Sequence, residues 1–432
     1  MKKLITTVIT VLAMVTVQAQ TVQFHFSNFA HAAYSYTLAK GDKQDTIAKG
    51  KLDAAGKAVI TLPKTQKNYK GIAKFTLAAG GGIDLVVNNE NFSVTGTETQ
   101  ISNENVKFTG SPENDFLNAM QQQKIILNKL AITATAVQVY KKEDALYAVF
   151  EKEKEQLGDA YRAQQTGIAQ SPLCAARFCE AVNFLMGAGS TPEMTQEDLI
   201  KQYKPFIKDK LDFENLYTSG LWSPLIENWS QMMQYGLKDD TVWYEDTKAI
   251  LARISNKTVY TAFADKMVGL FAKAGKDYMV SDLGKYIAAS GKVEKPGNRL
   301  ISAMNDLAID AAAPALQTPA GKKTINKKTL LFFYESGCNN CENEIHQLLG
   351  NYPIVKDKGY EVITVAADMT KEAGEGHGHE FPWSENLCDY KGFKGENFLN
   401  YGIIGTPTFF TIDANNKITG RYAKLIDTGI LN

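Results

Sequence analysis

Two cysteines separated by two residues are the side chains best suited to chemistry. Cys338 and Cys341 follow an apolar run, residues 330–334, that predicts a buried strand, and they precede isoleucine and leucine at helical spacing. The pair therefore lies where a strand passes into a helix. The free N–H groups and the dipole at such a helix end favour a thiolate, the nucleophilic form of cysteine. The spacing lets the second sulfur reach the first, so the pair can cycle between dithiol and disulfide.

The position of each thiol predicts its task. Cys338 is nearest the helix start, where exposure is expected, and it is assigned as the attacking nucleophile. Cys341 is expected to be the more buried, resolving thiol, which attacks the mixed disulfide formed on Cys338. An inert pair or a permanent disulfide is one alternative. Another is a zinc site completed by His377 and His379, but nothing holds their glycine-rich segment against the cysteines, so neither a metal nor a dissociable cofactor is expected.

The residues around the pair resemble the thioredoxin superfamily. The segment CNNCENE, residues 338–344, matches the CxxCxxE pattern of the TlpA-like branch, a group of secreted thioredoxin-like proteins that includes cytochrome-maturation reductases. The segment GTPTFF, residues 405–410, resembles the family's cis-proline loop leading into a strand, and residues 313–316, APAL, resemble the branch's entry segment. The resemblance covers roughly residues 312–432. It implies an α/β thioredoxin-like fold and thiol–disulfide exchange.

The resemblance also implies three further site residues. Glu344 would be the active-site acid, because a carboxylate near a thiol can carry protons during exchange; Glu335 and Glu342 are weaker candidates. Thr406 and Pro407 would face the cysteines and pair with an extended substrate peptide. The alternatives are a solvated helix charge at Glu344 and an ordinary strand-entry proline at Pro407.

Two positions depart from the family pattern. An aromatic residue usually precedes the first cysteine, and here that residue is Gly337. The dipeptide between the cysteines, residues 339–340, is Asn-Asn, without the proline or histidine of better-known members. Because this dipeptide helps set the redox potential, both directions of electron transfer stay open. Downstream, Trp383 is expected to pack in the core, and Cys388 is expected to be buried rather than redox-active.

Composition limits the classes of function. The chain has 432 residues, of which 44% are hydrophobic and 22% charged, values typical of a globular protein of two to four domains. The formal net charge is zero and no basic block stands out, so nucleic acid is not an expected partner. Five cysteines are too few for a disulfide framework in so long a chain, so apolar burial must stabilise the core.

The first 19 residues are typical of a signal peptide. Lys2 and Lys3 precede an apolar core, residues 4–17, that is too short and too threonine-rich for a good membrane span. Residues 17–19, Val-Gln-Ala, offer a cleavage site, with an uncleaved anchor as the alternative. The expected location is a bacterial periplasm or the cell exterior, where disulfide chemistry gains weight.

Hydrophobic spacing predicts three domains after residue 19. Alternation and glycine-rich turns over residues 20–110 predict an all-β domain, an antiparallel sandwich or open barrel. Its layout resembles the small β-rich domain that often precedes TlpA-like domains. Residues 111–310 show helical periodicity and predict an α-helical domain. Residues 311–432 form the expected thioredoxin-like α/β domain.

Local signals mark the helical domain. Ser111, Pro112 and Glu113 are typical of an N-cap, a first helical position and an acidic first turn. Cys174 and Cys179 fall on different faces of one predicted helix, which favours two buried free thiols over a structural disulfide.

These observations predict a secreted or periplasmic thiol–disulfide oxidoreductase that acts on protein or peptide disulfides. A reductase that takes electrons from a membrane partner is favoured over an oxidase. One alternative is a non-catalytic binding protein with a degenerate thioredoxin-like scaffold. A peroxiredoxin is another, but residues 335–338, Glu-Ser-Gly-Cys, do not match its usual Thr-x-x-Cys motif.

Overall fold

The computed structural model describes residues 20–78, 80–120, 122–187, 195–305, 307, 309–375 and 379–432. The expected signal peptide and His377 lie outside the described residues. The chain divides into two compact units, Met1–Trp229 and Ser230–Asn432. Within the described residues, no helix combines the length and apolar character needed to span a membrane.

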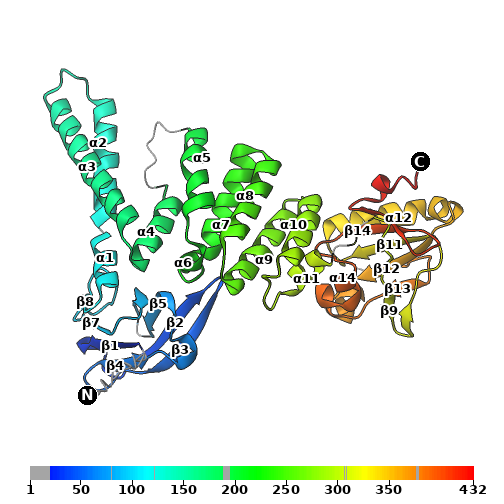
Figure 1. Cartoon of the computed structure of the whole chain (residues 1–432), viewed down its shortest axis with the longest axis horizontal. Coiled ribbons are helices and arrows are strands. Elements are labelled where there is room, and N and C mark those ends of the chain that lie inside the picture. Colours follow the sequence, from blue (N-terminus) through cyan, green and yellow to red (C-terminus); the bar gives the residue numbers. More distant parts are fainter. Residues whose placement is uncertain are drawn as a thin grey trace, which may run out of the picture. The chain divides into compact units, whose positions relative to one another are not determined.

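Two four-stranded sheets begin the first unit (Figure 1). One has the order β4-β1-β7-β8 and the other β3-β2-β5-β6. The strands are β1 (Thr21–Phe26), β2 (Ala33–Lys40), β3 (Lys43–Lys51), β4 (Lys57–Thr61), β5 (Lys70–Leu77), β6 (Gly82–Asn88), β7 (Phe92–Gly96) and β8 (Lys107–Thr109), with the 3-10 turns η1 (Ser27–Phe29) and η2 (Lys64–Gln66). Their pairs are antiparallel, as expected, except that β1 and β7 run parallel. Strand β7 follows a short connection that carries the chain from the sheet of β6 to the other sheet.

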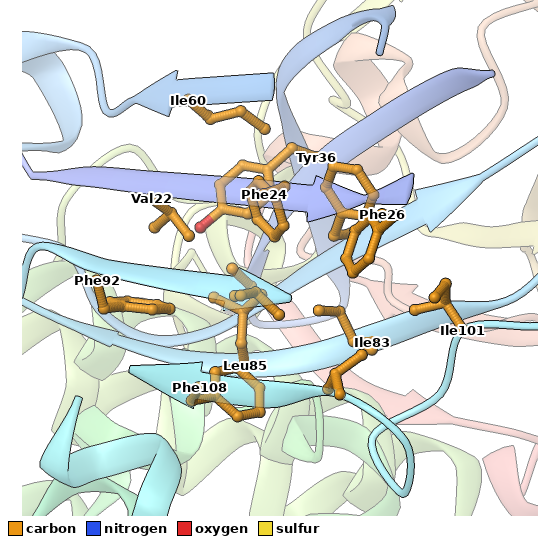
Figure 2. Close-up of a cluster of buried hydrophobic side chains, with 14 of the residues drawn as sticks. Val22, Phe24, Phe26, Tyr36, Ile60, Ile83, Leu85, Phe92, Ile101 and Phe108 are labelled. Atoms are coloured by element: carbon orange, nitrogen blue, oxygen red, sulfur yellow. The ribbon is translucent and has the colours of Figure 1, made fainter. Parts of the chain in front are cut away.

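The two sheets share one apolar core (Figure 2). Phe24 and Phe26 of β1 are buried while His25 between them is exposed, the alternation typical of a strand with one face in a core. The rings of Phe24 and Phe75 stack with their centroids 4.2 Å apart, and the ring of Tyr36 meets Phe24 edge-on at 6.0 Å. Aromatic burial therefore holds the sheets together.

Helices make up the rest of the first unit. They are α1 (Pro112–Met120), α2 (Gln122–Val139), α3 (Ala145–Gln170), α4 (Cys174–Leu185), α5 (Gln196–Pro205), α6 (Phe213–Tyr217) and α7 (Trp222–Gln231), with a π-helical turn η3 (Phe206–Lys210) after α5. The boundary between the two units falls inside α7. Helices α2 and α3 pack side by side as a hairpin (Figure 1).

A buried carboxylate joins the sheets of this unit to its helices. Glu113 lies in the first turn of α1, as expected, but only 1% of it is exposed. It accepts hydrogen bonds from the backbone N–H groups of Cys174 (3.1 Å) and Ala175 (2.7 Å) at the start of α4, and from Nδ2 of Asn88 (2.7 Å) at the end of β6. A carboxylate at a helix N-terminus satisfies free N–H groups and complements the dipole. Glu113 therefore caps α4, a helix other than its own.

The two cysteines of α4 are both buried, and neither forms a disulfide. Cys174 and Cys179 are free thiols, and Sγ of Cys174 donates to Oδ1 of Asn215 (2.9 Å). Burial raises the pKa of each thiol to about 12. Both side chains are therefore neutral in the folded protein at physiological pH.

The second unit begins with packed helices. They are a π-helical turn η4 (Met232–Leu237), α8 (Asp240–Arg253), α9 (Lys257–Lys273), α10 (Asp277–Ser290) and α11 (Asn298–Met304). The rings of Trp243 and Phe271 meet edge-on at 4.6 Å and tie α8 to α9. Helix α11 packs against α9 and α10, and it also contacts α14 of the α/β segment described next.

A five-stranded sheet of order β13-β12-β11-β14-β15 forms the centre of the α/β segment. Its strands are β11 (Thr329–Tyr334), β12 (Glu361–Ala366), β13 (Glu385–Leu387), β14 (Thr408–Ile412) and β15 (Ile418–Tyr422), and a hairpin of β9 (Leu316–Thr318) and β10 (Gly321–Lys323) precedes them. Its helices are α12 (Asn339–Asp357), α13 (Lys371–Glu375) and α14 (Glu396–Asn400), with 3-10 turns η5 (Gly392–Lys394) and η6 (Leu425–Thr428). Strand β11 runs parallel to β12 and antiparallel to β14. Residues of β11 are buried throughout, as the apolar run predicts.

Helix α12 covers one face of this sheet, and shorter elements cover the other. Ile345 and Leu348 of α12 pack against Phe332 and Phe409, whose rings stack at 4.2 Å. On the opposite face, a second apolar cluster brings together residues of β9, α14 and the sheet, including Phe333. The central strand is thus shielded from water on both faces, and only its ends meet solvent.

Candidate active site

The turn from β11 into α12 presents Cys338 at one edge of the sheet. The chain leaves β11 at Tyr334, and Cys338 is the N-cap residue of α12. Gly337 has a φ of 76°, in the left-handed region that side chains disfavour. This turn explains why glycine, rather than an aromatic residue, precedes the first cysteine.

The two thiols differ sharply in exposure. Cys338 is half-buried, whereas Cys341, in the first turn of α12, is fully buried, and both are free thiols. The two thiols are in hydrogen-bonding contact. Burial raises the pKa of Cys341 to about 12, although contacts with the backbone of Glu335 and the side chain of Thr406 act in the opposite direction. Cys341 is therefore a protonated thiol behind a more accessible one.

The loop before β14 completes this edge. The Thr406–Pro407 peptide bond is cis, and the side chain of Thr406 hydrogen-bonds to Cys341. The hydroxyl of Thr408 donates to the carbonyl oxygen of Gly405 (2.9 Å), which fixes the loop. The structure thus brings Thr406 and the two cysteines together from segments about seventy residues apart in the sequence.

Glu344 lies on the same helix but is engaged elsewhere. Its Oε2 accepts a hydrogen bond from the backbone N–H of Leu425 (2.8 Å), the first residue of η6. Glu344 is half-buried, and this contact fixes η6 against α12. The contact directs Oε2 toward η6.

A second acidic residue of α12 is held beside the first cysteine. The backbone N–H of Gly337 donates to Oε1 of Glu342 (3.1 Å), and Oε2 of Glu342 lies 2.6 Å from Nε2 of His379. The ring of His379 meets that of His346 edge-on at 5.3 Å. The sequence alone makes Glu342 a candidate acid, because it lies in the first turn of the predicted helix. No local pattern indicates His379, which is 37 residues away in sequence.

The zinc alternative gains no support from this arrangement. His379 pairs with Glu342, and His377 lies outside the described residues. Over the ranges that the structure describes, no three or more histidine, cysteine or acidic side chains gather closely enough to hold a metal ion.

Asp368 fixes the turn from the neighbouring strand. It follows β12, is 6% exposed, and accepts hydrogen bonds from the backbone N–H (3.1 Å) and the hydroxyl (2.8 Å) of Ser336. Sγ of Cys388 donates to its carbonyl oxygen at 3.8 Å. An acidic residue after a buried strand is the signal that could have identified Asp368, because the ends of parallel neighbouring strands meet at one edge of a sheet.

The remaining downstream residues mainly pack. Cys388 is half-buried and free, and burial raises its pKa. Trp383 is buried as expected, stacks on Phe381 at 4.8 Å, and donates from Nε1 to the hydroxyl of Thr364 (3.2 Å).

Two carboxylic acids and two thiols act on Tyr334, the last residue of β11. Burial raises the pKa of Tyr334, and the nearby groups of Asp368, Cys388, Glu342 and Cys341 raise it further. These four side chains therefore surround the end of β11.

Comparison with known proteins points to redox chemistry for this segment. No model of a known protein family matches the chain. Two curated relatives are named thiol-disulfide oxidoreductase ResA. That of Bacillus thuringiensis subsp. konkukian is 34% identical over 92 residues, 21% of this chain and 52% of the relative. That of Bacillus anthracis is 32% identical over 97 residues, with the same coverage. The chain thus spans about half the length of the curated relatives it matches.

Solved structures overlap a similar share of the chain. The thioredoxin domain of a thiol-disulfide oxidoreductase from Bacteroides vulgatus is 24% identical, with a TM-score of 0.25, and the match covers 29% of this chain and 100% of that one. StoA from Bacillus subtilis is 23% identical, with a TM-score of 0.22, and the match covers 27% and 90%. Over about a fifth of its length, this chain is similar to relatives that are named thiol-disulfide oxidoreductases.

Proposed function

We propose that this protein is a periplasmic or secreted thiol–disulfide oxidoreductase of the TlpA-like kind, which reduces disulfides in proteins or peptides. The observation that carries the proposal is the pairing of a half-buried thiol at the start of α12, Cys338, with a fully buried thiol in contact with it, Cys341. An accessible thiol can attack a large substrate, and a concealed one can only react with the first.

In the first step, the thiolate of Cys338 attacks one sulfur of the substrate disulfide. A bond forms between Sγ of Cys338 and that sulfur, and the substrate S–S bond breaks. The other substrate sulfur leaves as a thiolate and takes up a proton. Cys338 is the N-cap residue of α12, so its sulfur lies beside the free N–H groups at the start of that helix.

In the second step, Cys341 resolves the mixed disulfide. Its thiol loses a proton and attacks Sγ of Cys338, which releases the second substrate sulfur as a thiol. The substrate has then gained two electrons and two protons, and Cys338 and Cys341 end as a disulfide. Because burial raises the pKa of Cys341 to about 12, this step needs a proton acceptor. We assign that role to Oε1 of Glu344, one helical turn further along α12, while Oε2 keeps its hydrogen bond to the N–H of Leu425.

Repeated turnover needs a reductant. We infer that a membrane-bound thiol partner reduces the Cys338–Cys341 disulfide, so that the protein works as a reductase without a dissociable cofactor. Thr406 and Pro407 are proposed to contact the substrate chain, since their loop lies against Cys341.

Reduction of insulin disulfides by the purified chain, with a chemical thiol as reductant, tests the proposal. The wild type should accelerate reduction over the reductant alone, and Cys338→Ala should not. Cys341→Ala should accumulate a mixed disulfide between Cys338 and the substrate, visible as an added mass that a reductant removes. Equal rates for the wild type and Cys338→Ala would overturn the proposal and favour a binding role for the scaffold.

A further inference from the structure

Two large apolar side chains lie exposed on loops beside the cysteines. Met369, three residues after the end of β12, is 63% exposed, and Tyr390, three residues after the end of β13, is 45% exposed. Strands β12 and β13 are parallel neighbours, so both loops leave the same edge of the sheet. Strand β11, which is parallel to β12, delivers Cys338 to this edge as well.

Hydrogen bonds connect these loops to the cysteine turn. Asp368, the residue before Met369, accepts two hydrogen bonds from Ser336, which is two residues before Cys338. The thiol of Cys388, two residues before Tyr390, donates to the carbonyl oxygen of Asp368. The exposed side chains therefore belong to the same bonded framework as the proposed nucleophile.

The backbone holds both side chains in place. Tyr390 has a φ of 55°, a left-handed conformation that is costly for a large side chain and that persists only where its surroundings impose it. The carboxylate of Asp389 accepts a hydrogen bond from the backbone N–H of Lys391 (3.0 Å) across this residue. Gly392 is buried, and a Cβ there would lie 2.7 Å from Sδ of Met369. Because Gly392 has no side chain, there is room beside it for the thioether of Met369.

The charges next to these residues are balanced. Lys371 and Glu372 follow Met369, and Asp389 and Lys391 flank Tyr390. All four side chains are exposed. Two positive and two negative charges give a ligand of either sign little advantage, so binding here would depend on apolar contact.

We propose that Met369 and Tyr390 form an apolar lip that binds the part of a substrate polypeptide next to its disulfide. This inference deepens the proposed function and rests on it, because it names the substrate class. That class is a flexible or unfolded chain with an apolar or aromatic residue within a few positions of its cysteine. A small disulfide such as oxidised glutathione reaches Cys338 but has no apolar side chain for the lip.

The test compares two disulfides reduced by the full chain. One is a disulfide-linked peptide with phenylalanine two residues from each cysteine, and the other is oxidised glutathione. For Met369→Ser, Tyr390→Ser and the double variant, kcat/KM for the peptide should fall about fivefold to twentyfold, mainly through KM. The rate with oxidised glutathione should stay at the wild-type value. A peptide with serine in place of phenylalanine should be insensitive to both substitutions.

Ile354→Ser is the matched control. Ile354 is an exposed apolar residue (41%) on α12, but it lies 16 residues beyond Cys338, about 24 Å along the helix. Ile354→Ser should leave the rates of reduction of both the peptide and oxidised glutathione at their wild-type values. Salt between 50 and 500 mM should leave the KM of the peptide unchanged, since apolar contact is not screened.

Three outcomes would count against these ideas in different ways. If the Met369 and Tyr390 variants lose activity equally towards the peptide and oxidised glutathione, or keep full activity towards both, the apolar lip is overturned while the proposed function stands. If the wild type reduces neither the peptide nor oxidised glutathione, the proposed function fails and the inference fails with it.

Discussion

Burial separates the chemical properties of Cys338 and Cys341, two residues that are identical in type and adjacent in space. Cys341 is fully enclosed, and its pKa is raised to about 12, while Cys338 reaches the surface at the start of α12. A thiol reacts as its thiolate, and the thiolate must also be reached by the reagent. Burial works against both requirements at Cys341.

Selective alkylation follows from this difference. In the reduced protein at pH 8, iodoacetamide should modify Cys338 at least about 100-fold faster than Cys341, because a thiol of pKa about 12 is ionised to about one part in ten thousand. Raising the pH from 8 to 10 should speed modification of Cys341 about 100-fold, since its thiolate fraction rises tenfold per unit below its pKa. Peptide mass spectrometry of Cys338→Ala and Cys341→Ala variants measures each rate. Similar rates in the two variants would contradict the assignment of roles.

Glu342 places a negative charge close to the same thiol. Its carboxylate accepts from the N–H of Gly337 and contacts His379. Glu342→Gln keeps an oxygen that can accept from Gly337 but removes the charge, so a thiolate at Cys338 becomes less costly. We expect alkylation of Cys338 at pH 7 to accelerate about threefold to tenfold. The reduction potential of the pair should rise by up to about 30 mV, the equivalent of tenfold in a two-electron couple.

The control for this charge effect is Glu361→Gln. Glu361 pairs with Lys327 at 3.6 Å at the start of β12, the end of that strand away from the cysteines. Equilibration with glutathione buffers gives the potential of each variant. An unchanged potential in Glu342→Gln, or an equal change in Glu361→Gln, would show that the carboxylate beside Gly337 does not tune the pair.

At the scale of elements, the strand–turn–helix around the cysteines was predictable because its signals are local. The apolar run of β11, the glycine at position 337 and the leucine spacing of α12 lie within about twenty residues of one another. The strand after Pro407 was predictable for the same reason. Such segments carry their own burial pattern, so the sequence states which face is inside.

Other features depend on partners that no local pattern names. Strand β3 forms the edge of its sheet and is polar apart from Ile47 and Ala48, so it gives little alternation to detect. The contact between Glu342 and His379 joins residues 37 positions apart. The parallel pairing of β1 with β7 likewise depends on where the chain changes sheets. Tertiary contacts, rather than propensity, decide each of these.

Gly337 gives the element-scale prediction. Its φ of 76° belongs to the region where a Cβ is disfavoured. Gly337→Ala should therefore lower the free energy of unfolding by about 1–2 kcal/mol. Gly350, within α12 and with open space around it, is the matched control, because alanine there should stabilise the helix by about 0.5–1 kcal/mol. Denaturant titration of both variants measures the difference, and destabilisation of both by the same amount would be inconsistent with a strained turn.

At the scale of the whole molecule, buried thiols couple folding to pH. Burial raises the pKa of Cys174 and of Cys179 to about 12 from an ordinary value of 9.0. A raised pKa means that the folded state holds the proton more tightly than the unfolded chain. The resulting stability is fully present below about pH 9 and is lost as the pH rises towards 12, at up to about 1.4 kcal/mol per pH unit for each thiol.

A double variant isolates this effect from tyrosine ionisation. The free energy of unfolding of the wild type should fall between pH 8 and 10.5 more steeply than that of Cys174→Ala/Cys179→Ala, because the variant lacks both protons. Urea titrations at each pH, under reducing conditions, give the two slopes. Parallel slopes would mean that these thiols ionise equally in the folded and unfolded chains.

The cap that Glu113 provides to α4 bears on how this protein can be cut for experiments. A fragment that starts at α4 lacks Glu113 and leaves the N–H groups of Cys174 and Ala175 without their acceptor, and a fragment that ends between α1 and α4 leaves the buried carboxylate of Glu113 without these two donors. Expression trials should therefore keep residues 20–229 in one piece. Insertions of tags or protease sites near residue 113 should abolish soluble material sooner than similar insertions into the α2–α3 connection.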